Sequence, residues 1–227
     1  TRGENFGYDL EKALTHGFDA VIVSVPHKSH IHVAQKAVLA GSDVLIEKPI
    51  SNDYEEASKF IAYAESLGRK VFVVCNMRYH PAILALKDHM FEIGQPLFAR
   101  AHYGNYLPDM RPGIDYRSLY VADKDEGGVL LDGIHELDYL SWFFGNINWV
   151  FGESCHISDL EIIADDYSAL IVKHQSGVRS EIHLDYCRRV KRRGCEITGA
   201  NGVLHWISEG KSPEHCTVRL YQPDTGW

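Results

Sequence analysis

Two groups of polar residues in this sequence combine side-chain types that can move protons. The first is Glu47-Lys48-Pro49, which closes a mostly apolar run that begins at residue 43. In open α/β sheets the ligand crevice lies at the carboxyl ends of the strands. A lysine placed there can hydrogen-bond a reacting hydroxyl or help to remove its proton. The alternative interpretation is a surface salt bridge where the strand leaves the sheet.

The second group is Asp132, His135 and Asp138, which follows Gly127-Gly128. Residues three apart on a helix share one face, so Asp132 and His135 are expected to project together, opposite a stripe of Leu and Ile. A carboxylate beside an imidazole orients the ring and stabilises its protonated form, which suits His135 as a general base. The alternative is an ordinary solvated face of an amphipathic helix.

The first third of the chain has the pattern needed to position Lys48. Three short apolar runs alternate with two amphipathic segments, which is typical of a parallel sheet with crossover helices. Near-continuous β-branched runs indicate strands buried on both faces. We expect Asn52 and Glu55 to form a capping box before the second crossover helix. The predicted strands are 19–26, 43–49 and 70–76, and the predicted helices are 4–17, 29–40 and 53–67.

After residue 80 the pattern changes. Helices are predicted over 81–93 and 128–144, a strand over 97–106 and a loop over 107–126. From residue 148 onward apolar residues recur at every second position, which is typical of a half-buried antiparallel sheet. Asn201-Gly202 is a strong hairpin signal. We therefore predict part of a doubly wound (Rossmann) α/β domain over 1–80. An α+β domain over 81–227 follows, with an open, mostly antiparallel sheet and helices on one face.

Composition narrows the function classes. The chain carries 31 acidic and 23 basic residues, a formal charge of −8, so general nucleic-acid binding is not expected. Apolar runs are too short for a membrane span. Five cysteines without a CxxC pair favour a reducing compartment, and we expect a cytoplasmic protein.

Two further clusters have simple interpretations. His27, His30 and His32 lie close in sequence, but His30 and His32 point in different directions on a helix, and no metal site is expected. The basic run 188–193 is interpreted as a charged connection or edge between two strands, or as a phosphate contact in an oligomer.

Taken in order, several stretches resemble the GFO/IDH/MocA family of NAD(P)-dependent oxidoreductases, which includes glucose–fructose oxidoreductase and inositol dehydrogenase. The matches extend over nearly the whole chain, and Glu47-Lys48-Pro49 is the most specific of them. The matching stretches are 19–26, His30, 40–49, 76–79, 93–94, 115–117, 127–128, His135 with Asp138, and 199–202.

The resemblance implies a dehydrogenase that passes a hydride between NAD or NADP and a secondary alcohol of a sugar, sugar derivative or cyclitol. It implies that Lys48 contacts the reacting hydroxyl, His135 is the catalytic acid/base and Asp132 supports it. The remaining implied cofactor contacts are Pro26, His27, His30, Glu47, Pro49 and Arg78. The implied substrate contacts are Tyr116, Arg117 and Asp138.

The sequence also departs from the family pattern. His27 stands where members commonly have Asn, and Asp132 precedes the histidine by three residues rather than four. No G-x-G-x-x-G phosphate loop occurs among the 227 residues. We therefore expect a fragment truncated at the N-terminus and near the C-terminus, and a homodimer or homotetramer through the second sheet. Two alternatives are an NAD-dependent glycoside-cleaving enzyme of the same fold and a non-catalytic dinucleotide- or sugar-binding regulator.

Overall fold

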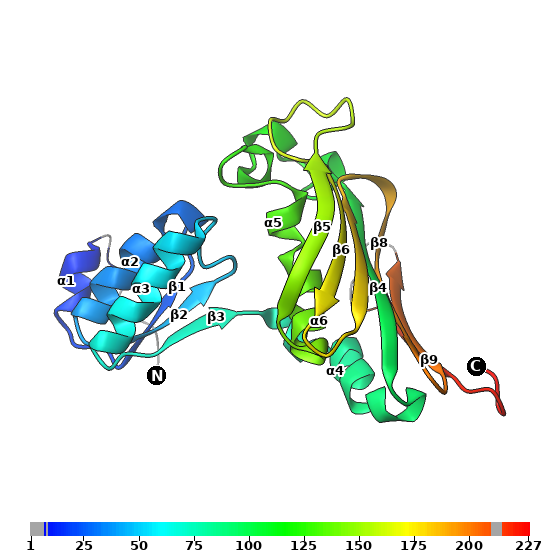
Figure 1. Cartoon of the computed structure of the whole chain (residues 1–227). Coiled ribbons are helices and arrows are strands. Elements are labelled where there is room, and N and C mark those ends of the chain that lie inside the picture. Colours follow the sequence, from blue (N-terminus) through cyan, green and yellow to red (C-terminus); the bar gives the residue numbers. More distant parts are fainter. Residues whose placement is uncertain (1–6, 8, 210–214) are drawn as a thin grey trace. The chain divides into compact units, whose positions relative to one another are not determined.

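The computed structural model describes residue 7 and residues 9–209 and 215–227. The described chain forms two compact units that divide between Val74 and Cys75 (Figure 1). The sequence places the domain boundary six residues later, after residue 80. Each unit has its own sheet and its own buried apolar core, so the two are described separately.

Unit 1 is a three-stranded parallel sheet in the order β1-β2-β3, with helices on one side. The helices α1, α2 and α3 line up along the sheet (Figure 1). Each strand leads through a crossover helix to the next, and right-handed crossovers that advance in one direction put those helices on the same face. Its elements are α1 (Leu10–Leu14), β1 (Ala20–Val23), α2 (His30–Leu39), β2 (Asp43–Glu47), α3 (Tyr54–Ser66) and β3 (Val71–Val74).

The opposite face of this sheet is open, which corrects one prediction. The register places Ile22, Leu45 and Phe72 in one row across the three strands. Ile22 is 71% exposed and Phe72 is 53% exposed. The expectation of strands buried on both faces is therefore wrong for the described residues, because helices of unit 1 cover only one side.

Two local details of unit 1 also differ from the prediction. Asp53, rather than Asn52, caps α3, and its carboxylate accepts hydrogen bonds from the backbone N–H groups of Glu55 and Glu56. The predicted helix at 4–17 is present as α1, which is shorter, while residues 4–6 and 8 lie outside the described part.

Unit 2 is built on a seven-stranded sheet in the order β10-β9-β8-β4-β7-β6-β5. Every neighbouring pair is antiparallel except β4 with β7, which is parallel. The mostly antiparallel sheet is as predicted. Its elements are α4 (Pro81–Asp88), β4 (Pro96–Tyr106), α5 (Val129–Asp132), α6 (Ile134–Phe144), β5 (Ile147–Cys155), β6 (Tyr167–His174), β7 (Arg179–Asp185), β8 (Cys187–Gly199), β9 (Val203–Glu209) and β10 (Cys216–Tyr221).

The helices of unit 2 pack on one face of this sheet, as expected. Helix α6 contacts β4 and β7, and α4 contacts β9 and β10. Between the helices and the sheet lies a core that includes fully buried Tyr139, Tyr186 and Trp206. The other face of the sheet is open and carries polar side chains beside exposed apolar ones.

Two predicted segments of unit 2 need correction. The single helix expected over 128–144 is two helices, because Gly133 interrupts it between α5 and α6. The basic run 188–193 is not a connection but part of β8. The hairpin at Asn201-Gly202 joins β8 to β9, with Thr198 opposite Val203, as predicted.

Candidate functional site

In unit 1 the predicted residues gather at the carboxyl ends of β1 and β2. Glu47 ends β2, and Lys48 and Pro49 follow it. His30 is buried at the start of α2, and its two ring nitrogens each lie 2.8 Å from a backbone carbonyl oxygen, one of Val25 and one of Pro49. The ring therefore ties the loop after β1 to the loop after β2 and fixes the backbone next to Lys48.

This edge fits part of a dinucleotide site. The three strands are parallel, so their carboxyl ends meet at one edge, which is where nucleotides bind in such sheets. His27 is buried in the short 3₁₀ turn directly after Pro26. The structure thus places Pro26, His27, Glu47, Lys48 and Pro49 on the two loops that His30 connects.

In unit 2, helix α5 holds Asp132 in a fixed place. The Asp165 carboxylate accepts a hydrogen bond from the Leu130 N–H at 3.1 Å, and the Asp165 carbonyl accepts one from the Val129 N–H at 2.9 Å. Gly128 reaches this position with φ of +92°, and a Cβ atom there would lie 2.1 Å from an Asp165 carboxylate oxygen. The glycine therefore lets the chain pass Asp165 and enter α5.

Helix α6, which carries His135, is fixed by a buried ion pair. The Arg193 guanidinium on β8 donates to both Glu136 carboxylate oxygens, at 2.7 and 3.0 Å, and also lies over the Tyr103 ring. Burial alone would lower the pKa of Arg193, but the neighbouring Glu136 carboxylate outweighs burial and raises it. Arg193 therefore stays charged and anchors the first turn of α6 to the sheet.

His135 lies on a different face of its helix from the one predicted. It is buried on α6 together with Glu136, Tyr139 and Leu140, whereas Ile134 is only half-buried. The expectation that His135 would lie opposite the buried stripe is wrong, because His135 is itself buried, next to Glu136, whose carboxylate pairs with Arg193 on β8. Asp132 is the last residue of α5, and His135 lies in the first turn of α6. Asp132 and His135 are therefore close in sequence but belong to consecutive helices.

A cavity of about 830 Å³ opens beside Asp132 within unit 2. This volume suits a small-molecule ligand. Its walls come from β4, the segment after β4, the 3₁₀ turn at 120–122 and the start of β8. The lining residues are Tyr103, Asn105, Tyr106, Pro108, Asp109, Met110, Arg111, Pro112, Leu119, Tyr120, Val121, Asp132, Arg189, Val190 and Lys191.

Two tyrosines shape the surroundings of Asp132. Burial, together with the negative charge of Asp132, raises the pKa of Tyr103 and of Tyr186. Both phenols therefore stay protonated and can act as hydrogen-bond donors. The Tyr186 hydroxyl is 3.3 Å from the Gly128 carbonyl oxygen and also interacts with the Asp132 carboxylate.

Arg78 and Asp138, predicted separately as cofactor and substrate contacts, bind each other. The Arg78 guanidinium donates to both carboxylate oxygens of Asp138, at 2.9 and 2.6 Å. The hydrogen bonds that Arg78 donates to Asp138 raise the pKa of Arg78. The pair ties the segment after β3 to helix α6.

Tyr116 and Arg117 lie outside the residues that line this cavity. The Tyr116 hydroxyl accepts a hydrogen bond from the Glu161 N–H at 3.2 Å. Arg117 is exposed and forms ion pairs with Asp115 at 2.8 Å and Glu161 at 3.0 Å. Their role as substrate contacts remains a prediction, as does that of Asp138.

The structure thus brings together the loops of unit 1 that carry Pro26 and Pro49, whereas of the predicted unit 2 residues only Asp132 lines the cavity. Lys48 belongs to unit 1, and Asp132 and His135 belong to unit 2. Sequence reasoning missed the cavity residues Tyr103, Asn105, Arg189 and Lys191. The available signal was only the basic run 188–193 itself, because the position of Arg189 and Lys191 depends on an irregularity in the pairing of β8 with β4.

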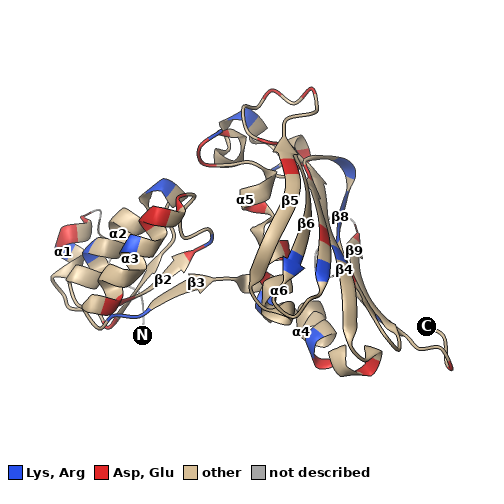
Figure 2. Cartoon of the chain, viewed as in Figure 1, with Lys and Arg blue, Asp and Glu red and all other residues tan. Residues whose placement is uncertain are grey.

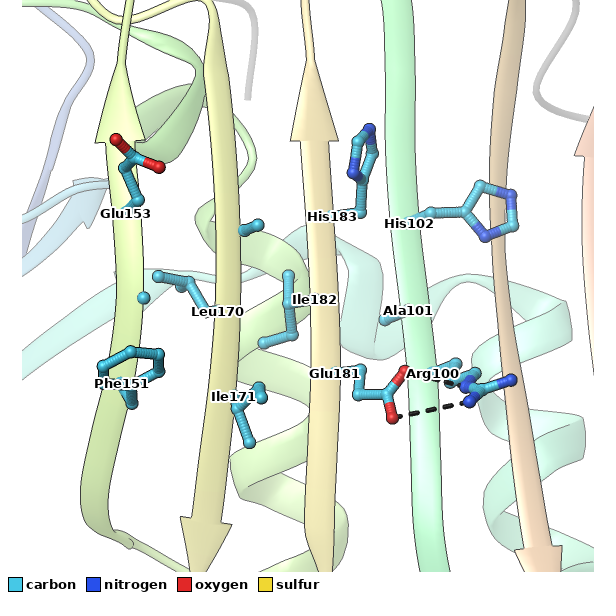
Figure 3. A pocket seen from close by; sticks show the side chains of 12 residues that line it. Arg100, Ala101, His102, Phe151, Glu153, Leu170, Ile171, Glu181, Ile182 and His183 are labelled. Atoms are coloured by element: carbon cyan, nitrogen blue, oxygen red, sulfur yellow. Dashed lines mark hydrogen bonds and ion pairs between the residues drawn. The ribbon is translucent and has the colours of Figure 1, made fainter.

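A second, shallow depression of about 570 Å³ lies on the open face of the sheet (Figure 3). The register aligns Phe151, Ile171, Glu181 and Arg100 in one row across four strands, and an ion pair joins Arg100 to Glu181 at 2.8 Å. Exposed Phe151 makes this face partly apolar.

Metal and membrane features are absent from the described ranges. No group of three or more His, Cys, Asp or Glu side chains in residues 9–209 and 215–227 is arranged to hold a metal ion. Within the same part of the chain, no helix has the length and apolar character required to span a bilayer.

Comparison with known proteins identifies the two units. A model of the GFO/IDH/MocA C-terminal domain matches residues 91–205, and a model of the oxidoreductase family with an NAD-binding Rossmann fold matches residues 4–75. The first match covers half of the chain.

Individual relatives agree. The chain is 26% identical to D-apiose dehydrogenase of Paraburkholderia graminis over 87% of this chain and 53% of that protein. It is 28% identical to 1,5-anhydro-D-fructose reductase of Ensifer adhaerens over 82% of this chain and 56% of that protein. The chain therefore spans about half the length of these curated relatives.

Solved structures share the fold. The WlbA dehydrogenase of Bordetella pertussis, crystallised with NADH and UDP-GlcNAcA, superposes with a TM-score of 0.77 at 21% identity, over 88% of this chain and 63% of that one. An oxidoreductase of Agrobacterium radiobacter, crystallised with NAD+, L-tartaric acid and magnesium, gives 0.77 at 20% identity, over 93% and 64%. With a Rossmann-type parallel sheet, an open mostly antiparallel sheet and both matching family models, the chain belongs to the GFO/IDH/MocA family of oxidoreductases.

Proposed function

We propose that the protein containing this chain is an NAD(P)-dependent dehydrogenase that oxidises a secondary alcohol of a sugar, sugar derivative or cyclitol. The observation that carries the proposal is the 830 Å³ cavity beside Asp132, on the unit that also bears His135. Similar proteins named as apiose, anhydrofructose and inositol oxidoreductases support a polyhydroxylated substrate.

The residues divide the work by their chemistry. The His135 imidazole accepts the proton of the reacting hydroxyl, and the Lys48 ammonium donates a hydrogen bond to the same oxygen as negative charge develops on it. The Asp132 carboxylate favours the protonated form of His135. A bound NAD(P)+ would supply the hydride acceptor, so that oxidation of the alcohol would give a ketone, NAD(P)H and the proton taken up by His135.

Several other residues act by holding these groups in place. His30 fixes the backbone around Pro49, Glu136 and Arg193 fix the start of α6, and Arg78 with Asp138 fixes its next turn. Pro26, His27, Glu47 and Pro49 form the cofactor side of the proposed site. Such positioning matters because small displacements of reacting groups are costly in rate.

The test is substitution of the two proposed proton-transfer groups in the whole protein. Lys48→Met and His135→Asn are each expected to lower kcat by about 10²–10⁴-fold, the usual range for losing a general acid or base. The measurement is NAD(P)H formation with a panel of sugars and cyclitols. Lys59→Met is the matched control, because Lys59 is exposed on α3.

The proposal fails if either variant turns over at the wild-type rate while its free energy of unfolding is unchanged. The same panel distinguishes the dehydrogenase from the two alternatives. Cleavage of a glycosidic bond without net NAD(P)H formation would favour the glycoside-cleaving enzyme. Ligand binding without any turnover would favour the regulator.

We further propose that the open face of the second sheet packs against another copy of the chain, giving a dimer or tetramer. Two in-register rows on this face combine apolar and charged side chains. One row holds Phe151, Ile171, Glu181 and Arg100, and the next holds Trp149, Lys173, Arg179 and Phe98. Exposed Trp149, Phe151 and Phe98 support burial in an assembly.

The five cysteines are free, which supports our proposal that the protein works in a reducing compartment, the cytoplasm.

A further inference from the structure

The lining of the cavity beside Asp132 includes three basic residues. Arg111, Arg189 and Lys191 all line it, and they come from two separate segments, the loop after β4 and the start of β8. Figure 2 marks the basic residues along β8 in blue. The chain as a whole carries a formal charge of −8, so a basic wall on one cavity is a local feature.

An irregularity in β8 produces this wall. In the pairing of β4 with β8, Gly104 faces Arg192 and the next pair is Tyr106 with Cys187. The four residues 188–191 therefore face only Asn105 on β4. Such a bulge bends the strand and changes the direction of its side chains, as often happens beside active sites. The bulge places Arg189, Val190 and Lys191 along the cavity.

The three basic residues that line the cavity differ from the other basic residues of β8 in their ion-pair partners. Arg188 pairs with Asp185, Arg192 with Glu209 and Arg193 with Glu136. By contrast, among the described residues no carboxylate forms an ion pair with any of the three cavity cations. Arg189 instead stacks on the Tyr106 ring, with its guanidinium carbon 3.6 Å from the ring centre.

Other residues that line the cavity suit hydroxyl groups. Asp132 offers carboxylate oxygens as acceptors, the Tyr103 phenol is a donor and the Asn105 amide is both. The Asn105 amide nitrogen lies 3.5 Å from the Tyr103 oxygen, so these two groups are held side by side. A molecule that carries both hydroxyls and an anionic group would match both kinds of lining residue.

We propose that the substrate of this site is an anionic sugar derivative whose carboxylate or phosphate binds Arg189 and Lys191. This inference rests on the proposed function, because it assigns a substrate class to the same site. Arg189 provides a planar guanidinium that is held by Tyr106, and Lys191 provides a half-buried ammonium. Arg111, an exposed residue that also lines the cavity, adds positive charge. Charge-assisted hydrogen bonds from these groups would distinguish an acid from its neutral analogue.

The experiment measures binding and turnover separately. Matched ligands differ at one terminal group: D-glucitol against D-gluconate for the carboxylate, and D-glucitol against D-glucitol 6-phosphate for the phosphate. Titration calorimetry of the full chain gives Kd for each. We expect at least one anionic member to bind at least about tenfold more tightly than D-glucitol, with the difference shrinking as salt is added.

Substitutions then locate the anion. Arg189→Gln and Lys191→Gln are each expected to weaken binding of the anionic ligand by about tenfold while leaving binding of D-glucitol unchanged. Arg219→Gln on β10 and Lys124→Gln in the loop before Gly127 are matched controls, because neither lines the cavity. Both controls should retain wild-type Kd values.

Three results would overturn the inference: equal affinity for neutral and anionic members, no binding of either class, or variants that behave like the controls. The proposed function is judged by a different readout, NAD(P)H formation. If neutral polyols are oxidised as efficiently as acids, the dehydrogenase stands and the anionic preference fails. If anions bind through Arg189 and Lys191 but no hydride transfer occurs with any member, the preference stands and the dehydrogenase fails.

Discussion

Glu136 has a completely buried carboxylate, and both of its oxygens bind Arg193. Removing two charges from water costs free energy. The attraction between Glu136 and Arg193 offsets that cost only while both partners are present. Its value lies in its position, because it fixes the first turn of the helix that carries His135. Arg100 and Glu181 form a chemically similar pair on the open face, where both side chains are more than half exposed.

We predict that Glu136→Gln lowers the free energy of unfolding by about 3–5 kcal/mol, since Arg193 would keep a buried charge without a counterion. Glu181→Gln should change it by only about 0–1 kcal/mol, because water screens the exposed pair. Urea denaturation of both variants is the measurement. Equal effects from the two substitutions would contradict the role given to burial.

His102 links stability to pH. Burial, assisted by the nearby Arg192 and Arg188 guanidinium groups, lowers the pKa of His102 to about 4. In the unfolded chain a histidine has a pKa of about 6.5, so as the pH falls the unfolded state takes up a proton first. Stability from this residue is therefore complete above about pH 6.5 and is lost progressively toward pH 4.

We predict that His102 makes the protein about 2 kcal/mol less stable at about pH 5 than at about pH 7.5. His102→Asn should remove that part of the pH dependence, whereas His32→Asn, on an exposed position of α2, should leave it unchanged. Unfolding free energies at both pH values for the three proteins are needed. A wild-type slope in His102→Asn would exclude this explanation.

At the scale of elements, short segments with specific backbone geometry place the site. Helix α5 is one turn long, yet it carries Asp132, and it starts at a glycine with positive φ that passes close to Asp165. Gly177 also has a positive φ, +90°, but a Cβ atom there would meet nothing within 4 Å. A comparison of substitutions at Gly128 and Gly177 therefore separates the cost of left-handed backbone geometry from the cost of a steric clash.

We predict that Gly177→Ala lowers the free energy of unfolding by about 1 kcal/mol, the cost of left-handed geometry for a residue with a Cβ atom. Gly128→Ala should cost more than this, because its Cβ atom would also overlap the Asp165 carboxylate. It should also weaken ligand binding in the cavity, since α5 must move. Identical unfolding free energies for the two variants would show that Asp165 adjusts freely.

Much of this element structure could be predicted from the sequence. Periodicity located β2, α3 and the hairpin between β8 and β9. In these segments the buried residues recur at the period of the element itself, every second residue in a strand and every three to four residues in a helix. Asp132 was predicted as the carboxylate that supports His135; it lines the cavity, and its role stays a prediction. The reach of Arg189 and Lys191 could not be predicted, because it depends on a four-residue bulge opposite Asn105. The face of α6 was also missed, because the burial of Glu136 requires a partner 57 residues away on β8.

At the scale of the whole molecule, the open sheet face is the main unexplained surface within unit 2. Phe151 is 74% exposed there, and Phe91, in a 3₁₀ turn after α4, is 78% exposed. These two residues have the same chemistry and nearly the same exposure in the single chain. They differ in that Phe151 belongs to the in-register rows of the proposed interface.

We predict that the protein sediments as a dimer or tetramer at micromolar concentration and that Phe151→Asp dissociates it, because a buried charge would oppose association. Phe91→Asp should leave the assembly intact. Sedimentation velocity on the three proteins is the measurement. A monomeric wild type, or dissociation by Phe91→Asp alone, would rule out this face as the interface.

The parallel pairing of β4 with β7 has a consequence for biosynthesis. The strand at the centre of the second sheet is made early, but both of its neighbours come much later; Arg100 meets Glu181 across 81 positions of sequence. Contacts this distant slow folding, because the intervening chain must be closed into a loop first. On the ribosome, β4 must therefore leave the exit tunnel with both edges unpaired, and the second unit completes its core only after β9, which carries Trp206, has been synthesised. During that interval the nascent chain presents an open strand of the kind that chaperones shield from aggregation.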